Sequence, residues 1–532
     1  MIKNEIQIAI QKALTELGAG EVTYVVERPA DMEHGDYATN AALAAAKILK
    51  KNPKEVAAAL TQTLEGKIVG VKKIEVAGVG FINFTISGMT IKDIVHEAHA
   101  QGWGSNDLYK GKKIMVEYTD PNPFKEFHIG HLMSNAIGES IARLLEAAGA
   151  SVTRANYQGD VGLHVAKAIW GKQQKPEAAW GDAYVFGSTE YEQNKEAIDA
   201  LNKKIYENDN EIAGLYEEGR NHSLEEFEKI YAILGTKFDN YFFESESWQV
   251  GLELVKKNIG NVFEESEGAV VYKGEQDGLH TRVFLTKAGL TTYEAKDLGL
   301  LKLKEKTGEF DVSITITASE QKEYFKVVLA AAKKIDEVKD IANKTVHVTH
   351  GMMRFAEGKM ASRTGNVITG ESLIADLTAQ ARGRQDVAVG AIKYAVLKSG
   401  SGKDIIFDPA KSLSTEGDSG PYLQYALVRA RSLLRKANDA EAVEPAVSGP
   451  GPLERLLMHY PEVVEHAANE LEPHYVVTYL TEIASSFNSW YAGERFIVDG
   501  KVSRRTLAVI QAVENTLAQG LKVLGIPAPE QM

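Results

Sequence analysis

The sequence predicts an α/β fold, with an α+β domain before the α/β part and an all-α bundle after it. Over residues 107–385, short apolar segments alternate with amphipathic segments of helix length, as the βα units of a parallel sheet do. Residues 1–106 mix helical and alternating patterns, and helical patterns dominate residues 386–532. A chain of 532 residues has room for three or four domains of ordinary size. We therefore expect three domains with these boundaries, the central one Rossmann-like.

The N-terminal domain begins with an amphipathic helix over residues 1–18. Its apolar residues recur every three or four positions and share one face, and Gly18 is a suitable C-terminal stop. An Ala-rich helix is expected at about 39–51, and Pro53 opens another helix. Residues 74–86 alternate as strands do, so this domain is expected to be α+β.

The central domain begins with a strand–helix–strand unit: a strand at 112–118, a helix from about 128 to 148 and a strand at 151–157. Polar, helical residues from about 170 to 275 then indicate an insertion, with no strand pattern before residue 269. The βα pattern resumes after the insertion. It comprises strands at 283–286, 312–317 and 346–349 and helices at 293–304 and 319–334.

The composition narrows the classes of site that fit. The chain has no cysteine, which excludes disulfides, thiolate zinc sites and cysteine nucleophiles. No stretch of about 18 apolar residues is present, so neither a membrane helix nor a membrane partner is expected, and a reducing cytoplasm fits. The net charge of −13 argues only weakly against nucleic-acid binding, because a basic surface can exist on an acidic protein.

The tetrapeptide His128-Ile129-Gly130-His131 stands where the first turn of the central domain leads into the long helix. The helix N-terminus offers unpaired N–H groups and a positive dipole end, and the two histidines share one face. Gly130 has no Cβ, so a flat ring could lie against the backbone. The motif predicts an ATP site, with adenine beside Gly130 and the phosphates near His128 and His131. A capping histidine and a packed histidine are the alternative for the motif alone; its strand–turn–helix position favours the nucleotide.

A second basic motif spans 359–366, in a loop between two glycines that follows the strand at 346–349. Lys359 and Arg363 could reach a triphosphate, and Ser362 could hydrogen-bond to it. Cations near the β and γ phosphates would stabilise the expulsion of pyrophosphate. A solvated basic loop is the alternative for this motif alone, but two motifs in this order favour the nucleotide site.

These motifs resemble those of the class I aminoacyl-tRNA synthetases, and among them the arginyl-tRNA synthetases, along the whole chain. The first motif is the family's HIGH signature unchanged, and the second resembles its KMSKS loop in part. Ala361, Ser362 and Arg363 stand at the loop's third to fifth positions, and Lys125 matches a lysine that arginyl enzymes are thought to use instead of the loop's second lysine. The resemblance implies a catalytic set of Lys125, His128, His131, Lys359 and Arg363. It implies ATP contacts by His128, Gly130, His131, Lys359, Met360 and Ser362.

Further segments resemble the arginyl family specifically, namely 117–122, 156–162, 420–425 and 524–532. Two residues depart from the family pattern. Val161 replaces a tryptophan, and His164 stands where glutamine is usual.

Arginine recognition calls for a carboxylate that can meet the planar, permanently charged guanidinium with both oxygens. Tyr293 and Asp297 are i and i+4 on one predicted helical face, and Glu117 ends the first strand, where ligands approach such sheets. The alternatives for Asp297 are a solvated acid and an acid paired with a structural arginine; Leu300 and Leu301 make its face apolar. The residues leave these interpretations about even, and the resemblance favours the site. It implies an arginine-binding set of Glu117, Asp120, Asn122, His131, Tyr293, Asp297 and Gln321.

The all-α bundle resembles the family's anticodon-binding domain, and the N-terminal domain resembles its additional tRNA-binding domain. The resemblance implies tRNA contacts by Tyr422, Tyr425, Arg429 and Trp490, through stacking on bases and pairing with phosphates. The alternative is that these aromatic residues pack the bundle and that the arginine is solvated.

The resemblance implies an arginine–tRNA ligase. Such an enzyme forms arginyl-adenylate from L-arginine and ATP, with Mg2+ and without zinc, and transfers arginine to the 3′-terminal ribose of tRNA(Arg). We expect a cytoplasmic monomer. Two alternatives remain: a small-molecule adenylyltransferase, which would normally lack long domains at both ends, and a non-catalytic arginine-sensing or RNA-binding relative.

Overall fold

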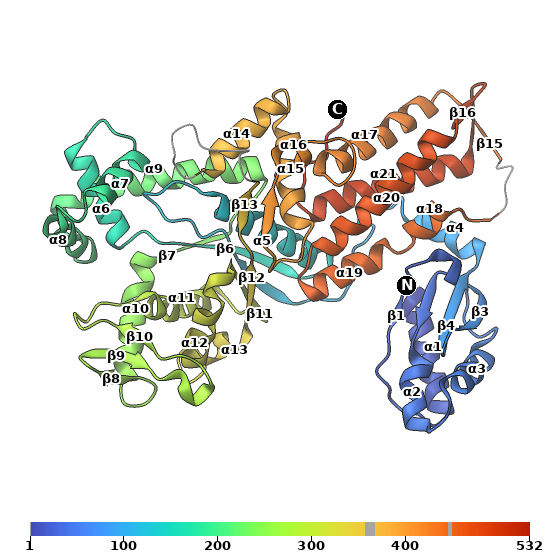
Figure 1. Cartoon of the computed structure of the whole chain (residues 1–532), viewed down its shortest axis with the longest axis horizontal. Coiled ribbons are helices and arrows are strands. Elements are labelled where there is room, and N and C mark those ends of the chain that lie inside the picture. The colour runs from blue at the N-terminus through green and yellow to red at the C-terminus, as the bar shows by residue number, and fades with distance from the viewer. Residues whose placement is uncertain (1, 357–367, 445–448) are drawn as a thin grey trace. The chain divides into compact units, whose positions relative to one another are not determined.

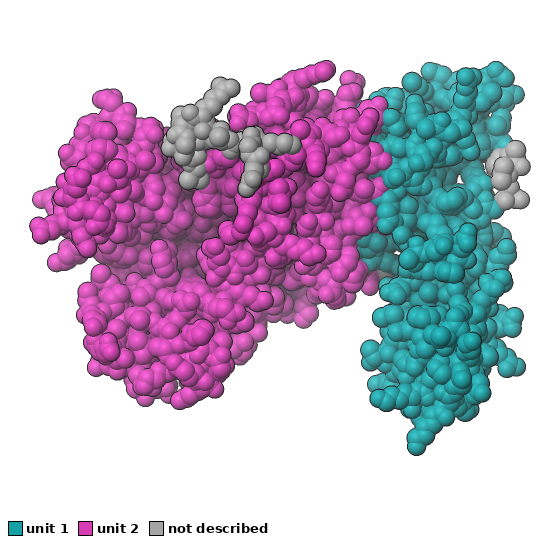
Figure 2. Space-filling model, viewed as in Figure 1, with its two compact units in different colours: residues 1–104, 426–463, 482–519 teal, residues 105–425, 464–481, 520–532 magenta. Residues whose placement is uncertain are grey.

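The computed structural model describes residues 2–356, 368–444 and 449–532 (Figure 1). The chain forms two compact units, each built from segments that are distant in sequence (Figure 2). Unit 1 comprises residues 1–104, 426–463 and 482–519, and unit 2 comprises residues 105–425, 464–481 and 520–532. In the described part of the chain, no helix combines the length and the apolar character needed to cross a membrane.

The N-terminal part of unit 1 is the α+β domain that the sequence predicts. Its helices are α1 (Ile2–Glu16), α2 (Ala41–Leu49), α3 (Pro53–Leu64) and α4 (Gly88–Glu97). Its antiparallel sheet has the order β1 (Val26–Glu27), β2 (Tyr37–Thr39), β4 (Phe81–Ile86) and β3 (Val71–Ala77). Ile6, Ile10 and Leu14 are buried along one face of α1, so the predicted apolar face is the packed one.

The C-terminal helices are α17 (Gly420–Ala437), α18 (Pro452–Leu457), α19 (Tyr460–Glu470), α20 (His474–Gly493) and α21 (Arg504–Val523). The helical character agrees with the sequence. A small sheet of β15 (Glu441–Val443), β17 (Lys501–Ser503) and β16 (Ile497–Val498) is additional. These strands of two or three residues are too short to produce an alternating pattern, so the sequence does not reveal them.

Unit 2 is built on a five-stranded parallel sheet (Figure 1). Its strands, in spatial order, are β12 (Thr345–His350), β11 (Val312–Ala318), β5 (Lys113–Glu117), β6 (Ser151–Gln158) and β7 (Asn240–Phe243). From β5 the chain proceeds outward through β6 and β7, and then returns to the other side of β5 for β11 and β12. The reversal between β5 and β11 is a topological switch point, where the carboxyl ends of the strands form a ligand-binding crevice.

Helices pack on the sheet and fix the ends of its strands. Helix α5 (Ile129–Ala147) contacts β5, β6, β11 and β12. Leu300 of α11 (Tyr293–Thr307) packs with Met115 of β5 and Ala155 of β6. Further helices of this region are α10 (Glu244–Lys257), α12 (Lys322–Ala332), α13 (Lys339–Lys344), α14 (Gly370–Gln380), α15 (Gln385–Leu397) and α16 (Pro409–Ser412). A two-stranded parallel sheet joins β13 (Met353–Phe355) and β14 (Ile405–Phe407).

The segment at 170–275 is mainly helical, as expected, but two expectations about nearby strands are wrong. Its helices, with the preceding one, are α6 (Leu163–Gln174), α7 (Trp180–Thr189), α8 (Lys195–Tyr206), α9 (Asn210–Leu234) and α10. The strand β7 lies inside this segment and forms the edge of the parallel sheet, although no strand was expected before residue 269. β7 has only four residues, too few to show a strand pattern.

The second difference concerns β10 (Arg282–Leu285), the strand expected to resume the βα pattern. It pairs antiparallel with β9 (Ala269–Tyr272), which pairs with β8 (Glu264–Ser266), in a sheet of its own. Sequence periodicity identifies a strand, but it does not identify the sheet that the strand joins.

Candidate functional site

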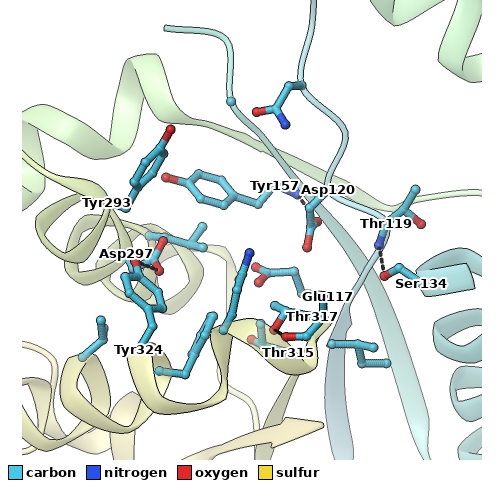
Figure 3. Close-up of a pocket in the computed structure, with 18 of the residues that line it drawn as sticks. Glu117, Thr119, Asp120, Ser134, Tyr157, Tyr293, Asp297, Thr315, Thr317 and Tyr324 are labelled. Atoms are coloured by element: carbon cyan, nitrogen blue, oxygen red, sulfur yellow. Dashed lines mark hydrogen bonds between the residues drawn. The ribbon is translucent and has the colours of Figure 1, made fainter. Parts of the chain in front are cut away.

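A cavity of about 580 Å³ opens at the switch point of the parallel sheet (Figure 3). Glu117 at the end of β5, Gly159 after β6, Ala318 at the end of β11 and His350 at the end of β12 all line it. Helices α11 and α12 supply the opposite wall. The cavity therefore has the position in which a doubly wound sheet binds its ligand.

The residues immediately after β5 adopt strained backbone conformations. Thr119 and Asp120 have φ angles of 80° and 45°, in the left-handed region that non-glycine residues rarely adopt. Ser134 of α5 accepts a hydrogen bond from the Thr119 backbone N–H at 2.9 Å, and the Tyr157 backbone N–H donates to Asp120 Oδ1 at 2.7 Å (Figure 3). Strain of this kind persists only where the surroundings hold it, and it is frequent at ligand-binding sites.

The two histidines of the tetrapeptide form the N-terminal cap of α5. His128 is the N-cap, and its Nδ1 accepts a hydrogen bond from the Gly130 backbone N–H at 3.1 Å. His131 Nδ1 accepts one from the His128 backbone N–H at 3.2 Å, and the two rings stack with centroids 3.6 Å apart. A Cβ on Gly130 would lie 2.9 Å from the His128 ring, so the ring that rests against Gly130 is an imidazole of the protein itself.

Both histidines are held neutral. Burial lowers the pKa of His128 and, more strongly, of His131, and the nearby Lys125 ammonium lowers both further. A neutral imidazole has one donor and one acceptor nitrogen. Because each Nδ1 accepts a backbone N–H, each Nε2 carries the proton. The pair can therefore donate two hydrogen bonds to an anion beside the positive end of α5.

Three carboxylates of the cavity have different partners. Glu117 Oε2 lies 2.8 Å from Lys304 Nζ in a buried ion pair. Asp297 Oδ2 accepts a hydrogen bond of 2.5 Å from the hydroxyl of Tyr324 (Figure 3). Burial raises the pKa of Asp297 to about 7, although the Tyr324 hydrogen bond opposes the rise, and burial together with the Glu117 charge raises the pKa of Asp120 well above its usual range. Of these acids, Glu117 alone has a protein cation as its partner within the described residues.

A second buried pair lies beside this cluster, where Lys296 Nζ is 2.6 Å from Glu244 Oε2. Glu117 and Glu244 each have a lysine, so among the described residues the cavity-lining acids without an ion-pair partner are Asp120, Asp297 and the exposed Glu320. Burial favours the uncharged form of Asp120 and Asp297, so a bound cation would stabilise their charged form, and a planar fork of donors would suit their oxygens. The cavity thus combines a region for a cation with a helix end for an anion.

The structure brings together every described residue of the predicted arginine set. Glu117, Asp120, Asn122, His131, Tyr293, Asp297 and Gln321 all line the cavity, as do Lys125, His128 and Gly130. Lys359, Met360, Ser362 and Arg363 lie outside the described residues. Tyr293 is 65% exposed and stands at the rim.

The two departures from the family pattern have structural roles. Val161 is buried in an apolar cluster with Phe124, Val165 and Trp180, so it serves the packing of the helical segment. His164 faces the cavity, where one ring nitrogen lies 2.8 Å from the carbonyl oxygen of Gly159, and burial lowers its pKa to about 3.

The predicted RNA contacts lie on the C-terminal helices and are distributed over both units. Tyr422 is half-buried and Tyr425 is partly exposed, both on the part of α17 that belongs to unit 2. In unit 1, Arg429 Nη1 donates to Asn488 at 2.5 Å, and Trp490 Nε1 donates to Glu494 at 2.9 Å. Arg429 is therefore paired with a side chain rather than solvated, and Trp490 and Tyr422 are both half-buried, whereas Tyr425 is more exposed.

Lys304, Tyr324 and Lys296 are site residues that the sequence did not single out. Lys304 carries a recognisable signal, because it follows Asp297 by seven residues, or two helical turns, on the same face of α11. Tyr324 follows Gln321 by three residues, but its link to Asp297 depends on how α12 lies against α11. Within the described part of the chain, no group of three or more acidic or histidine side chains is arranged to hold a metal ion.

Comparison with known proteins agrees with this geometry. Three family models match the chain: "Arginyl tRNA synthetase N terminal domain" over residues 2–86, "tRNA synthetases class I (R), catalytic domain" over 93–409 and "DALR anticodon binding domain" over 423–532. The arginine–tRNA ligase of Clostridium perfringens is 30% identical, with 98% of each chain covered, and that of Borrelia hermsii is 28% identical, with 100% of this chain and 99% of the relative covered.

Solved structures resemble the whole chain as well. The Thermus thermophilus arginyl-tRNA synthetase superposes with a TM-score of 0.82 at 27% identity, with both chains fully covered. The Plasmodium falciparum arginyl-tRNA synthetase, at 19% identity, shares the fold with a TM-score of 0.81, with 100% of this chain and 99% of the other covered. The switch-point cavity, the capped HIGH helix and these matches lead to one conclusion: the chain belongs to the arginyl-tRNA synthetase family of class I aminoacyl-tRNA synthetases.

Proposed function

We propose that the switch-point cavity is where this arginyl-tRNA synthetase activates arginine, with Asp297 as the carboxylate that accepts the guanidinium. The observation that carries the proposal is the pairing of charges inside the cavity. Glu117 and Glu244 are each paired with a lysine, whereas Asp297 and Asp120 lack a protein cation among the described residues. The permanently charged guanidinium of the substrate would supply the missing cation.

The remaining residues of the cavity have places suited to the rest of the substrate. Tyr293 stands at the rim beside Asp297 and would cover the side chain. Glu117, held by Lys304, would line the floor near the guanidinium rather than bind it directly. Asn122, Gln321 and His131 would bind the α-amino and carboxylate groups or support the acids.

We assign the ATP site to the start of α5. The two Nε2–H donors of His128 and His131, the helix end and Lys125 would stabilise charge on the phosphates. The resemblance adds Lys359, Met360, Ser362 and Arg363 to this site, with Gly130 beside the nucleotide. Mg2+ would arrive bound to the ATP phosphates and neutralise part of their charge.

The reaction has two steps. An oxygen of the arginine carboxylate attacks the α-phosphorus of ATP, and the bond to pyrophosphate breaks, which gives arginyl-adenylate. A hydroxyl of the 3′-terminal ribose of tRNA(Arg) then attacks the activated carbonyl carbon, and AMP leaves. The protein contributes positioning and charge stabilisation to the first step rather than a covalent nucleophile.

We further propose a division of labour along the chain: residues 1–106 bind tRNA, 107–385 catalyse, with an insertion at about 170–275, and 386–532 bind the anticodon region. Tyr422 and Tyr425, with Arg429 and Trp490, would contact the RNA, and Arg429 and Trp490 would first have to leave their present partners. We expect a monomer that acts in the cytoplasm.

Arginine-dependent exchange between ATP and pyrophosphate, measured with and without tRNA(Arg), tests the proposal. Wild-type protein should support exchange with arginine and not with lysine. Asp297→Asn should raise the arginine KM at least tenfold, because a neutral amide cannot replace the charge, and should leave the KM for ATP nearly unchanged. An unchanged arginine KM in this variant would exclude Asp297 as the guanidinium partner.

A further inference from the structure

We propose that Tyr324 is a positioning residue, which holds the Asp297 carboxylate in the orientation that accepts a guanidinium and so favours arginine over lysine. The inference rests on the proposed role of Asp297 and adds the residue that makes this acid selective. Tyr324 belongs to α12 and Asp297 to α11, and the Tyr324 hydroxyl donates to Asp297 Oδ2 at 2.5 Å (Figure 3).

Tyr324 is itself braced from two sides. The Arg282 guanidinium lies 5.4 Å from the centre of its ring, and Arg282 Nη1 is 3.1 Å from Glu294 Oε1. Glu294 stands three residues before Asp297 on α11, hence on the same side of the helix. The ring of Phe325 meets that of Tyr324 edge-on, with centroids 5.4 Å apart. The hydroxyl is therefore presented to Asp297 by a ring with little freedom to turn.

With this hydrogen bond in place, Asp297 can still accept two N–H donors of a guanidinium, one on each oxygen. Each carboxylate oxygen has two lone pairs, so Oδ2 can still accept one further bond and Oδ1 two. A guanidinium binds best when both oxygens are held in its plane, whereas the compact, rotatable ammonium of lysine places no such demand on the carboxylate. If the Asp297 carboxylate is free to rotate, the affinity for arginine should therefore fall more than the affinity for lysine.

Three other acids of the cavity have partners of their own, and a fourth, Glu320, is exposed. Glu117 is paired with Lys304, and Glu244 with Lys296. Asp120 is held through Oδ1 by the Tyr157 backbone N–H. A change in arginine selectivity caused by Tyr324 would therefore act through Asp297.

The same contact affects the protonation of Asp297, whose pKa burial raises to about 7. The Tyr324 hydrogen bond stabilises the charged carboxylate and opposes that rise, so its removal should raise the pKa further. Proton uptake would then weaken arginine binding at a higher pH. The charged and titratable groups facing Asp297 are Glu117 and Asp120 from β5 and its following turn, Tyr157 from β6, Glu244 from α10, Lys304 from α11 and Tyr324 from α12.

The experiment compares Tyr324→Phe with wild type in pyrophosphate exchange, with tRNA(Arg) present. We expect a rise in the arginine KM of roughly 10-fold or more, typical of the loss of a hydrogen bond to a charged group, and a kcat within about 2-fold of wild type. The acid limb of kcat/KM for arginine should move to higher pH. The preference for arginine over lysine, measured with lysine as a competitor, should narrow.

Tyr241→Phe is the matched control, since it also removes a tyrosine hydroxyl that donates to a carboxylate, that of Glu228, outside the cavity. Its arginine KM, its kcat, the acid limb of its kcat/KM and its preference for arginine over lysine should equal those of wild type. Thermal melting of both variants separates folding from function, because a merely structural Tyr324 would lower stability without moving the pH limb.

Asp297→Asn distinguishes the proposed guanidinium site from the positioning role of Tyr324. If Asp297→Asn leaves the arginine KM unchanged, the proposed guanidinium site fails, and the inference fails with it. A different outcome is that Asp297→Asn raises the arginine KM while Tyr324→Phe keeps the wild-type KM, pH limb and selectivity. In that case Tyr324 has no positioning role, and the inference alone is overturned. In the double variant, the KM effect of Tyr324→Phe should disappear, since no charged carboxylate remains to be positioned.

Discussion

Lys304 Nζ lies 2.8 Å from Glu117 Oε2, and both side chains are almost completely buried, at 1% and 2% exposure. Lys304 comes from α11 and Glu117 from the end of β5, so the pair joins the wall of the cavity to the sheet beneath it. Lys304 also donates to the Thr315 hydroxyl of β11 at 3.1 Å. The contact lies at the switch point, where Glu117 of β5 is paired with Thr315 of β11.

Replacing Lys304 by methionine should therefore be strongly destabilising. The variant leaves Glu117 buried without its counter-charge, which typically costs about 3–5 kcal/mol. Urea denaturation of Lys304→Met should show a correspondingly lower unfolding free energy. The double variant Lys304→Met, Glu117→Met should recover much of the loss, because it removes both charges together. A single variant as stable as wild type would contradict the buried pair.

His128 combines two roles that different substitutions should separate. Its Nδ1 caps α5 through the Gly130 N–H, and the side chain lines the cavity, where its Nε2–H is proposed to donate to phosphate. Asparagine can place an oxygen near Nδ1 but has no donor at Nε2, whereas glutamine reaches the Nε2 position but caps poorly. His128→Asn should keep the melting temperature and lower kcat roughly 10²–10³-fold, as loss of one transition-state donor does. His128→Gln should retain more activity and lose stability; the reverse order would contradict the assignment.

The sequence predicts the parts of the fold that local periodicity encodes. Strands β5, β6, β11 and β12 and helices α5 and α11 are long enough to show their patterns, and the cap at His128 follows from its place before α5. Strand β7 and the small C-terminal sheet are too short, and β10 shows a strand pattern without indicating its sheet. The element types are therefore predictable here, whereas sheet membership depends on tertiary contacts.

The site shows the same division between local and tertiary information. Tyr293 and Asp297 share a helical face, so their neighbourhood follows from sequence spacing. The sequence predicts Glu117 as a second acid for the guanidinium, and the fold adds an ion-pair partner, Lys304, 187 residues away along the chain. The contact of Tyr324 with Asp297 depends on the packing of α12 against α11, which sequence spacing does not encode. The resemblance thus named the acids, and the tertiary structure adds which of them has a lysine as its ion-pair partner.

Gly159 provides a test that affects binding more than folding. A Cβ at this position would lie 2.3 Å from Asn122 Oδ1, at the mobile end of a side chain. Gly159→Ala should therefore displace the Asn122 amide at small cost in stability and raise the arginine KM several-fold. Asn122→Ala should produce a similar KM, and the double variant should be no worse than either. Gly214→Ala, where the added methyl group meets no atom within 4 Å, is the control.

Lys393 joins the chain's C-terminal segment to the catalytic unit. Its buried Nζ donates to the carbonyl oxygens of Leu234 at 2.6 Å and Gly525 at 2.7 Å. Lys393→Met removes both hydrogen bonds and should lower the unfolding free energy at pH 9 by about 2 kcal/mol or more, since two buried carbonyl groups lose their donor. Lys398→Met, one turn further along and more exposed, should have little effect.

The stability loss caused by Lys393→Met should also depend on pH. Burial lowers the pKa of Lys393 to about 7, below the ordinary value of 10.5 that it regains on unfolding. Between these values the unfolded chain binds the extra proton, so the stability of wild type rises with pH relative to a variant without this group. The wild-type advantage should therefore grow from pH 7 to pH 10 in urea titrations. An advantage that stays constant over that range would mean that Lys393 keeps its proton in the folded protein, held by the two carbonyl oxygens.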